Sequence, residues 1–186
     1  FKGDPQEMVD KMYACEMSGC KAETTGCPFA SADSLKLTTS PSDLKYLHRE
    51  FHVSMDRGAD YARTTYGMDG LREYLAQFTA AFHVPLIADI KNRGLAAVED
   101  YLNWLYRTEE ASDALAMIAA PDELDVRILY CPAVRYMKGR GYTPSESYKY
   151  CTSMVYEALA ELTGIGFEMG DYDEETGAAT YRFIKK

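Results

Sequence analysis

Apolar residues follow helical spacing through most of the first two-thirds of the chain. From Pro41 to Gly67 one helix face collects Leu44, Leu47, Phe51, Met55, Ala59, Ala62 and Tyr66. A second face from Asp69 onward collects Leu71, Leu75, Phe78 and Phe82, with a kink or break at Pro85 and an end at Gly94. Residues 95–112 continue the same periodicity. Intervals of three and four residues predict amphipathic helices across this region.

The spacing changes from 3.6 to two residues after Pro121. Leu124, Val126, Ile128 and Tyr130 alternate with polar or exposed positions, which predicts a half-buried strand. A last helix, with Tyr148, Cys151, Val155, Leu159 and Leu162 on its apolar face, ends at Gly164. Two alternating segments around a turn at 173–177 then predict a β-hairpin. The expected fold class is α+β, a helical N-terminal two-thirds packed with a small antiparallel sheet of about three strands and one late long helix.

Three helix starts share the order cap residue, Pro, any residue, acid. They begin at Asp4-Pro5, Ser40-Pro41 and Thr143-Pro144. The cap oxygen accepts an orphan backbone N–H, and Pro has no N–H to leave unsatisfied. A Thr-, Ser- and Gly-rich stretch lies between the first two starts. We therefore predict an N-terminal helix with a Cys-containing loop as an appendage at 1–39, and one α+β domain at 40–186.

The charge balance excludes some classes of partner. The 186 residues carry 20 Lys and Arg against 29 Asp and Glu, a net charge of −9. Nucleic acid and anionic membranes need clustered basic residues, so we expect neither as a partner. No apolar run reaches the roughly 20 residues of a membrane helix. We expect a soluble, cytoplasmic protein. Because residue 1 is Phe, the sequence leaves open whether an N-terminal leader has been removed.

Two of the three histidines are candidates for chemistry. His48 and His52 are four residues apart in a predicted helix, so both imidazoles lie on one flank and could reach one metal ion or one substrate. The glutamate of the zinc-protease pattern adjoins the first histidine, whereas Glu50 is two residues on, so that pattern does not apply. Structural or interfacial histidines are the alternative. His83, beside the predicted kink, is expected to be structural.

The five cysteines fall into two groups. Cys15, Cys20 and Cys27 lie in the predicted appendage, with a spacing that matches neither zinc ribbons nor common iron–sulfur sites. Cys131 ends a predicted strand before Pro132, where the N-terminus of a following helix could lower the thiol pKa and favour the nucleophilic thiolate. A small buried hydrophobic residue is the alternative there. Cys151 lies on the apolar face of its helix and is expected to pack in the protein core.

The last third of the chain resembles a known family. Its features are a strand ending in Cys131-Pro132, a capped helix carrying Cys151, and a closing strand Thr180-Tyr181-Arg182-Phe183. In this order they resemble the L-2-amino-thiazoline-4-carboxylic acid hydrolase-like family over about residues 120–184. The resemblance implies hydrolytic opening of a cyclic, amidine-like thiazoline. The family often carries a cysteine before the aromatic residue of the last strand, where this chain has Ala179 and Thr180.

Three functions follow as hypotheses. The first is a small-molecule hydrolase that opens a C–N bond of a cyclic amidine or amide, with Cys131, His48 and His52 as catalytic residues. Tyr66, Tyr148 and Cys151 would bind the substrate, because Tyr66 shares a helix face with His48 and Tyr148 lies one turn from Cys151.

The other two hypotheses use the same residues differently. One is a metal-binding protein with His48 and His52 as ligands. The sequence does not identify a cofactor, and a divalent metal ion is the candidate. The other is a non-catalytic protein that holds a small molecule in a Tyr-lined pocket. A homo-oligomer or a partner subunit, docked through the N-terminal segment, is open in each case.

Overall fold

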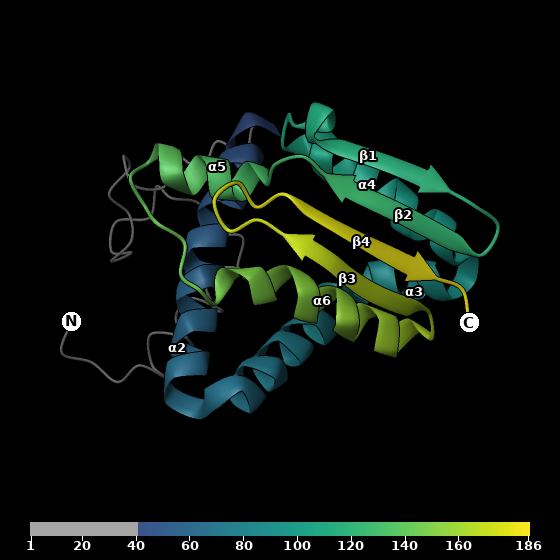
Figure 1. The fold of residues 1–186 in the computed structure, drawn as a ribbon, viewed down its shortest axis with the longest axis horizontal. Coiled ribbons are helices and arrows are strands. Elements are labelled where there is room, and N and C mark those ends of the chain that lie inside the picture. The colour runs from purple at the N-terminus through teal and green to yellow at the C-terminus, as the bar shows by residue number, and fades with distance from the viewer. Residues whose placement is uncertain (1–40) are drawn as a thin grey trace, which may run out of the picture. The chain divides into compact units, whose positions relative to one another are not determined.

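The fold runs from helices to a sheet, with two further helices between the second and third strands (Figure 1). The structure is a computed structural model and describes the backbone of residues 41–186 and the side chains of residues 51–186. The helices are α2 (Pro41–Phe82), α3 (Val84–Arg93), α4 (Leu95–Thr108), α5 (Pro132–Gly139) and α6 (Tyr148–Thr163). The strands are β1 (Leu115–Ala119), β2 (Glu123–Ile128), β3 (Gly166–Tyr172) and β4 (Ala179–Ile184). The predicted appendage at 1–39, with its three cysteines, lies outside the described residues.

The four strands form one antiparallel sheet in the order β1-β2-β4-β3. The predicted final hairpin is confirmed as β3 and β4, and the alternating segment as β2. The pattern does not predict β1, because Leu-Ala-Met-Ile-Ala has no alternation of polar and apolar residues and favours a helix by composition. Pairing with β2, from Leu115↔Ile128 to Ala119↔Leu124, overrides that preference. The α+β class is therefore confirmed, with four strands.

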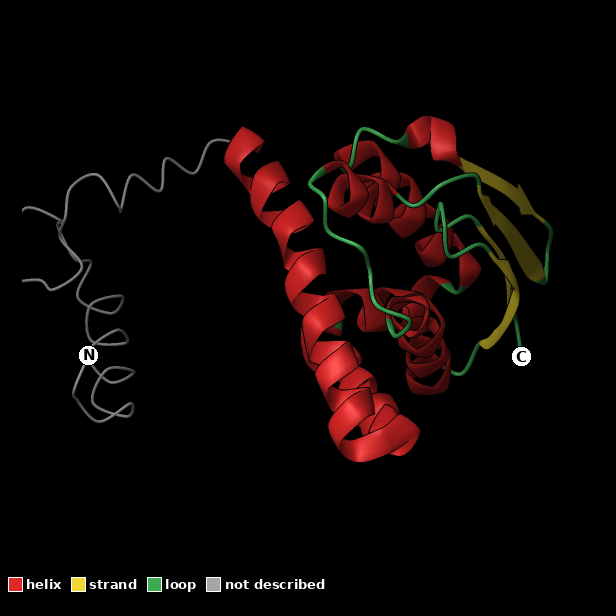
Figure 2. Ribbon diagram, turned by 60° about the vertical axis from the view of Figure 1, so that its left-hand side comes forward, coloured by secondary structure: helices red, strands yellow, loops and turns green. Residues whose placement is uncertain are grey.

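Helices cover one face of the sheet (Figure 2). The alternating residues of β2 and β4 that point toward them are buried, as the period of two predicts, and they are Leu124, Val126, Ile128, Ala179, Tyr181 and Phe183. They pack against Leu102 and Tyr106 of α4 and Ala160 of α6. On the opposite face, Ile118 of β1 is 73% exposed.

α2 contains a sharp bend at Gly67. This residue has φ 76° and ψ −170°, outside the helical region, so the predicted helix end at Gly67 is confirmed as a bend between two helical halves. In the first half Met55, Ala59 and Ala62 are buried, as predicted. Tyr66 is not: its side chain is 65% exposed, because the chain turns away from the core directly after it.

α6 begins later than the capping pattern predicts. The pattern places the start at Thr143-Pro144, whereas the helix starts at Tyr148. The Ser145 hydroxyl and backbone N–H both donate to the buried carboxylate of Asp56 in α2, so this segment is held by a tertiary contact instead of forming a first helical turn. The predicted end is confirmed, since Gly164 caps the helix in the left-handed conformation with φ 80°.

A second core joins α2, α5 and α6. Its buried residues include Ala59, Leu71 and Leu75 of α2, Met137 of α5 and Leu159 of α6. Residues from this core and from the core under the sheet line one partly open cavity, described below. Within residues 41–186, no helix combines the length and the hydrophobicity that a membrane crossing requires.

Candidate functional site

A cavity of about 150 Å³ lies where the two cores meet. Its wall is drawn from the helices and from β2, β3 and β4, and includes six tyrosines and three phenylalanines. The cavity is partly open to solvent, because Phe51 and Phe82 in its wall are 37% and 59% exposed. The predicted site residues His52, Cys131, Tyr148 and Cys151 all line it. The structure thus brings together four residues that are up to 99 positions apart in the chain (151 − 52).

Cys131 occupies the junction that its sequence context predicts. It follows β2 and is the N-cap of α5, with Pro132 at the first helical position. Its carbonyl accepts from the Arg135 N–H at 3.0 Å, and its own N–H donates to the Thr176 carbonyl at 2.9 Å. The turn between β3 and β4 therefore lies against the cysteine. Gly177 in that turn has φ 68°, and a side chain there would meet the Cβ of Cys131.

The thiol of Cys131 does not have the lowered pKa that its position suggests. Burial raises the pKa, and the negative charge of Glu109 acts in the same direction. The backbone N–H groups of Ala133 and Val134 and the hydroxyl of Tyr148 lower it, but burial is the larger effect. The expectation of a resting thiolate is therefore wrong. Any nucleophilic role for Cys131 requires a base that removes its proton.

Tyr148 connects Cys131 to His52. Its hydroxyl lies 3.1 Å from Nδ1 of His52, and its interaction with the Cys131 thiol lowers the pKa of that thiol. Burial raises the pKa of Tyr148 well above its ordinary value, so the phenol keeps its proton at neutral pH. A neutral hydroxyl can accept one hydrogen bond and donate another at the same time. Tyr148 of α6 therefore interacts both with Cys131 at the start of α5 and with His52 of α2.

Cys151 lies one turn after Tyr148 on α6. It is 7% exposed, and burial raises the pKa of its thiol to about 12. A thiol with that pKa is protonated at neutral pH and packs as a small apolar group. Cys151 thus lines the cavity, as expected for a substrate-contacting residue, and also packs in the core formed by α2, α5 and α6.

The remaining predicted site residues do not join this group. Tyr66 does not line the cavity, and its ring instead meets that of Tyr61 edge-on, with centroids 6.2 Å apart. His48 lies on α2, and its side chain is outside the described residues. Among the side chains that are described, no group of three or more His, Cys, Asp or Glu could hold a metal ion. The predicted metal site at His48 and His52 therefore gains no support.

Two further ionisable residues, Glu109 and His83, line the cavity, although the sequence pattern does not place them at a site. Glu109, directly after α4, lines the wall and is only 6% exposed. Its place beside Glu110 at a helix end gives no signal that one of the two acids turns inward. His83, between α2 and α3, also lines the wall, and burial lowers its pKa. Its imidazole is therefore neutral at neutral pH, which agrees with the structural role expected for it.

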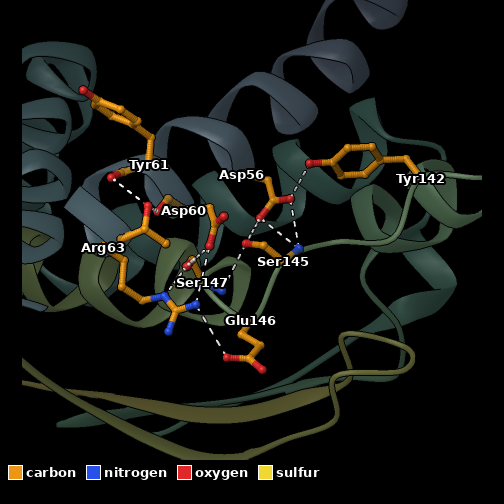
Figure 3. Close-up of polar contacts among 9 residues, drawn as sticks. Asp56, Asp60, Tyr61, Arg63, Tyr142, Ser145, Glu146 and Ser147 are labelled. Atoms are coloured by element: carbon orange, nitrogen blue, oxygen red, sulfur yellow. Dashed lines mark hydrogen bonds and ion pairs between the residues drawn. The ribbon is translucent and has the colours of Figure 1, made fainter. Parts of the chain in front are cut away.

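Asp56 fixes the segment that leads into Tyr148 (Figure 3). Its carboxylate is fully buried and accepts from the Tyr142 hydroxyl at 2.7 Å, the Ser145 hydroxyl at 2.6 Å and the Ser145 N–H at 3.0 Å. Asp56 follows His52 by one helical turn, so one stretch of α2 holds His52 and the segment that delivers Tyr148. The signal was present in the sequence, because an acid between Met55 and Ala59 falls on the apolar face.

A second set of polar contacts continues the same anchor one turn later (Figure 3). The Ser147 hydroxyl donates to Asp60 at 2.9 Å and accepts from Nε of Arg63 at 2.7 Å. Arg63 also lies 3.5 Å from the carboxylates of Asp60 and Glu146. We call these residues, together with Asp56, Tyr142 and Ser145, the polar anchor. It ends one residue before Tyr148 and thereby sets where α6 begins.

Comparisons of this chain with models of protein families, with curated proteins and with solved structures found no match.

Proposed function

We propose that the protein is a small-molecule hydrolase that opens a C–N bond of a cyclic amidine or amide, with Cys131 as the nucleophile. The single observation that carries this proposal is the Tyr148 hydroxyl, which lies 3.1 Å from His52 Nδ1 and interacts with the Cys131 thiol at the wall of one cavity. A nucleophile, a base that can reach its proton directly or through a second group, and a space for the substrate are the parts that nucleophilic catalysis needs.

The raised pKa of Cys131 makes the base necessary. As sulfur approaches the substrate carbon, the thiol proton passes to the Tyr148 oxygen, and the Tyr148 proton passes to Nδ1 of His52. The new C–S bond then forms while His52 carries the positive charge. Proton transfer of this kind contributes roughly 100- to 10,000-fold to a rate.

The rest of the reaction returns every group to its starting state. The ring C–N bond breaks, and the proton on His52 returns along the same path to the leaving nitrogen. This leaves an open-chain amine joined to Cys131 as a thioester or thioimidate. Water then adds to that carbon, the C–S bond breaks, and the water proton restores the thiol. One water is consumed, and no oxidant or reductant is needed.

The family resemblance points to the same reaction class. The Cys131-Pro132 element on which it depends lies at the cavity, and so does Cys151. Where the family often has another cysteine this chain has Ala179 and Thr180, and Ala179 lines the cavity as well. The proposed reaction uses Cys131 and does not need a thiol at either position.

The test is turnover of a panel of five-membered cyclic amidines and cyclic amides, followed by chromatography of the ring-opened product. We expect Cys131→Ser to lower the rate by at least about 100-fold. Tyr66→Phe is the control, because Tyr66 is remote from the cavity. If no member of the panel is opened, or if Cys131→Ser retains the wild-type rate, the proposal fails.

A non-catalytic role is the second candidate, and the protonated state of Cys131 favours it. The same cavity would then hold a small molecule without reacting with it. Native mass spectrometry of the purified protein distinguishes the two. A retained ligand of unchanged mass together with an absence of turnover supports binding alone.

A further inference from the structure

β1 is an edge strand, with β2 on one side only (Figure 1). At one end of the ladder the Leu129 N–H donates to the Ala114 carbonyl at 2.8 Å. At the other end the Ala120 N–H donates to the Glu123 carbonyl at 2.8 Å. Because hydrogen-bonded pairs alternate along an antiparallel ladder, the odd-numbered residues of β1 point their N–H and C=O groups away from β2. Within the described part of the chain no hydrogen bond reaches these outer groups, which belong to Leu115, Met117 and Ala119.

The two edges of the sheet differ in their protection against pairing with another chain. β3, at the other edge, has an irregularity in its pairing between Met169 and Tyr172, and it carries Glu168 and Asp171. Bulges and charged residues are devices by which natural proteins keep an edge strand from pairing. β1 is regularly paired with β2, and its sequence Leu-Ala-Met-Ile-Ala contains no charge and no proline. The β1 edge is therefore the one that is suited to pairing.

Two copies of β1 would pair along their whole length when Met117 lies opposite Met117 of the second copy. Leu115 then lies opposite Ala119, and the outward groups exchange about six backbone hydrogen bonds in all. α4 packs against both β1 and β2, so the two copies of α4 would flank the seam on one face. On the other face Ile118, which is 73% exposed, would pack beside Ala116 of the second copy.

Charges on β2 favour this register over its neighbours. Arg127 lies beside Ala116, and Asp125 lies beside Ile118. In the full register Arg127 shares a row across the seam with Asp125 of the second copy, and the symmetry repeats that row. The two Cα atoms would be about 14 Å apart, and the arginine stem closes part of the gap. Asp125 is held by Nε of Arg182 on the side away from the seam, at 2.6 Å.

Neighbouring registers lose this complementarity. A shift by two residues in one direction puts Arg127 in the same row as its own copy. A shift by two residues in the other direction does the same for Asp125. Like charges that face each other across strands oppose pairing. The register that pairs the whole strand is thus also the one that places opposite charges across the seam.

We propose that the protein forms a two-fold symmetric dimer through β1, with Met117 at the centre of the seam. The partner is a second copy of this chain, because the charge rows of β2 complement themselves in this register. A seam of one short strand buries less area than the roughly 1,200 to 2,000 Å² of a stable interface, so we expect a dissociation constant of about 1 to 100 µM. The dimer goes beyond the proposed function and makes no use of the cavity.

Sedimentation velocity of the full chain between about 1 and 300 µM measures the dimer. We expect the 20.9 kDa chain at the lowest concentration and twice this mass at the highest. Ile118→Lys adds a charge to the edge, in the row of Arg127 of the second copy, and should raise the dissociation constant at least about tenfold. Leu162→Lys is the control, because it makes a similar change at a 38% exposed position on α6.

Disulfide formation between copies tests the register. In Met117→Cys the two introduced thiols lie opposite each other, with Cα atoms about 5.5 Å apart, within the range of a disulfide. In Leu115→Cys the introduced residues are about 14 Å apart and cannot join. The double variant Leu115→Cys/Ala119→Cys restores an opposed pair. We expect at least about tenfold more linked peptide, identified by mass spectrometry, from Met117→Cys and the double variant than from Leu115→Cys.

The outcomes decide the dimer separately from the hydrolase. A monomer at every concentration overturns the inference, and so does a dimer that Ile118→Lys leaves as tight as before, since that dimer uses another surface. Equal cross-linking in Leu115→Cys and Met117→Cys also overturns it. If a cysteine variant does not fold, as judged by circular dichroism, Ile118→Lys at its exposed position decides alone. None of these measurements depends on turnover, so either proposal can fail while the other holds.

Discussion

The polar anchor and the cavity both use the first half of α2 and differ in what their polar groups do. In the anchor, Asp56 accepts three hydrogen bonds, and Ser147 bridges Asp60 and Arg63. At the cavity, one turn earlier on α2, His52 lies 3.1 Å from the Tyr148 hydroxyl, which also lowers the pKa of the Cys131 thiol. The anchor residues contact one another and do not line the cavity, whereas the polar groups of the cavity wall have open space beside them.

The comparison shows how scaffold and site can be distinguished. A buried carboxylate surrounded by donors holds a segment in place, because each contact is lost when the segment moves. A hydroxyl shared between a thiol and an imidazole can pass a proton without any movement of the chain. We therefore expect changes in the anchor to lower stability first, and changes at the cavity to lower activity first.

The largest expected effect is that of Asp56→Ala on stability. It leaves the Tyr142 hydroxyl and two donors of Ser145 without their acceptor in a buried place. We expect the free energy of unfolding to fall by about 3 kcal/mol or more. Urea unfolding followed by circular dichroism measures this, with Glu161→Ala as the surface control. A loss below about 1 kcal/mol would show that the anchor does not hold the segment.

Tyr148→Phe should separate activity from stability. It removes one oxygen and keeps the ring in place, so we expect the free energy of unfolding to fall by about 1 kcal/mol. The rate of ring opening should fall by about 100-fold, because the path from Cys131 to His52 is cut. Tyr66→Phe makes the same chemical change at an exposed site and should leave both quantities at wild-type values. Full activity in Tyr148→Phe would mean that the thiol loses its proton by another route.

Gly177→Ala tests the turn that lies against Cys131. With φ 68°, alanine is strained there by about 1 to 2 kcal/mol, and its Cβ would meet Cys131 and Val134. We expect a loss of stability of that size together with a slower reaction at Cys131. Gly139→Ala, in open space on α5, is the control. Thermal unfolding and turnover are measured on the same samples, and unchanged values in both would show that the turn is free to move.

The smallest expected effect is the pH dependence contributed by His83. Burial lowers the pKa of His83 in the folded protein, whereas an unfolded histidine binds its proton near pH 6.5. Between these two pKa values the unfolded chain binds more protons, so stability falls as the pH drops below about 6.5. His83→Gln should show a shallower decline in urea unfolding between pH 7 and pH 5. Equal slopes for the two proteins would show that His83 does not contribute.

Sequence patterns predict the elements of this protein better than their contacts. Periodicity predicts the bend at Gly67, the end of α6 at Gly164 and the alternation of β2 and β4, because these depend on neighbours in the chain. It does not predict β1, whose strand form comes from pairing with β2. It misplaces the start of α6, because a tertiary contact with Asp56 competes with the local cap.

The candidate site divides in the same way. The helix junction at Cys131 follows from local sequence, but the direction of its pKa does not, because burial by distant elements outweighs the local N–H groups. Tyr148 is predicted from its spacing to Cys151, whereas its bond to His52 depends on how α2 and α6 pack. Glu109 shows the limit most plainly. Nothing in its neighbourhood along the chain indicates that it turns into a cavity.

The most direct test of the account is the rate at which 2-chloroacetamide alkylates Cys131. Peptide mapping by mass spectrometry follows this residue separately from the other four cysteines, at pH 7.5, in the wild type, Tyr148→Phe and His52→Gln. We expect both variants to react at least about tenfold more slowly than the wild type. Tyr148→Phe removes the hydroxyl that lowers the pKa of the thiol, and His52→Gln removes the base behind that hydroxyl. Equal rates in all three proteins would contradict the proton path from Cys131 through Tyr148 to His52.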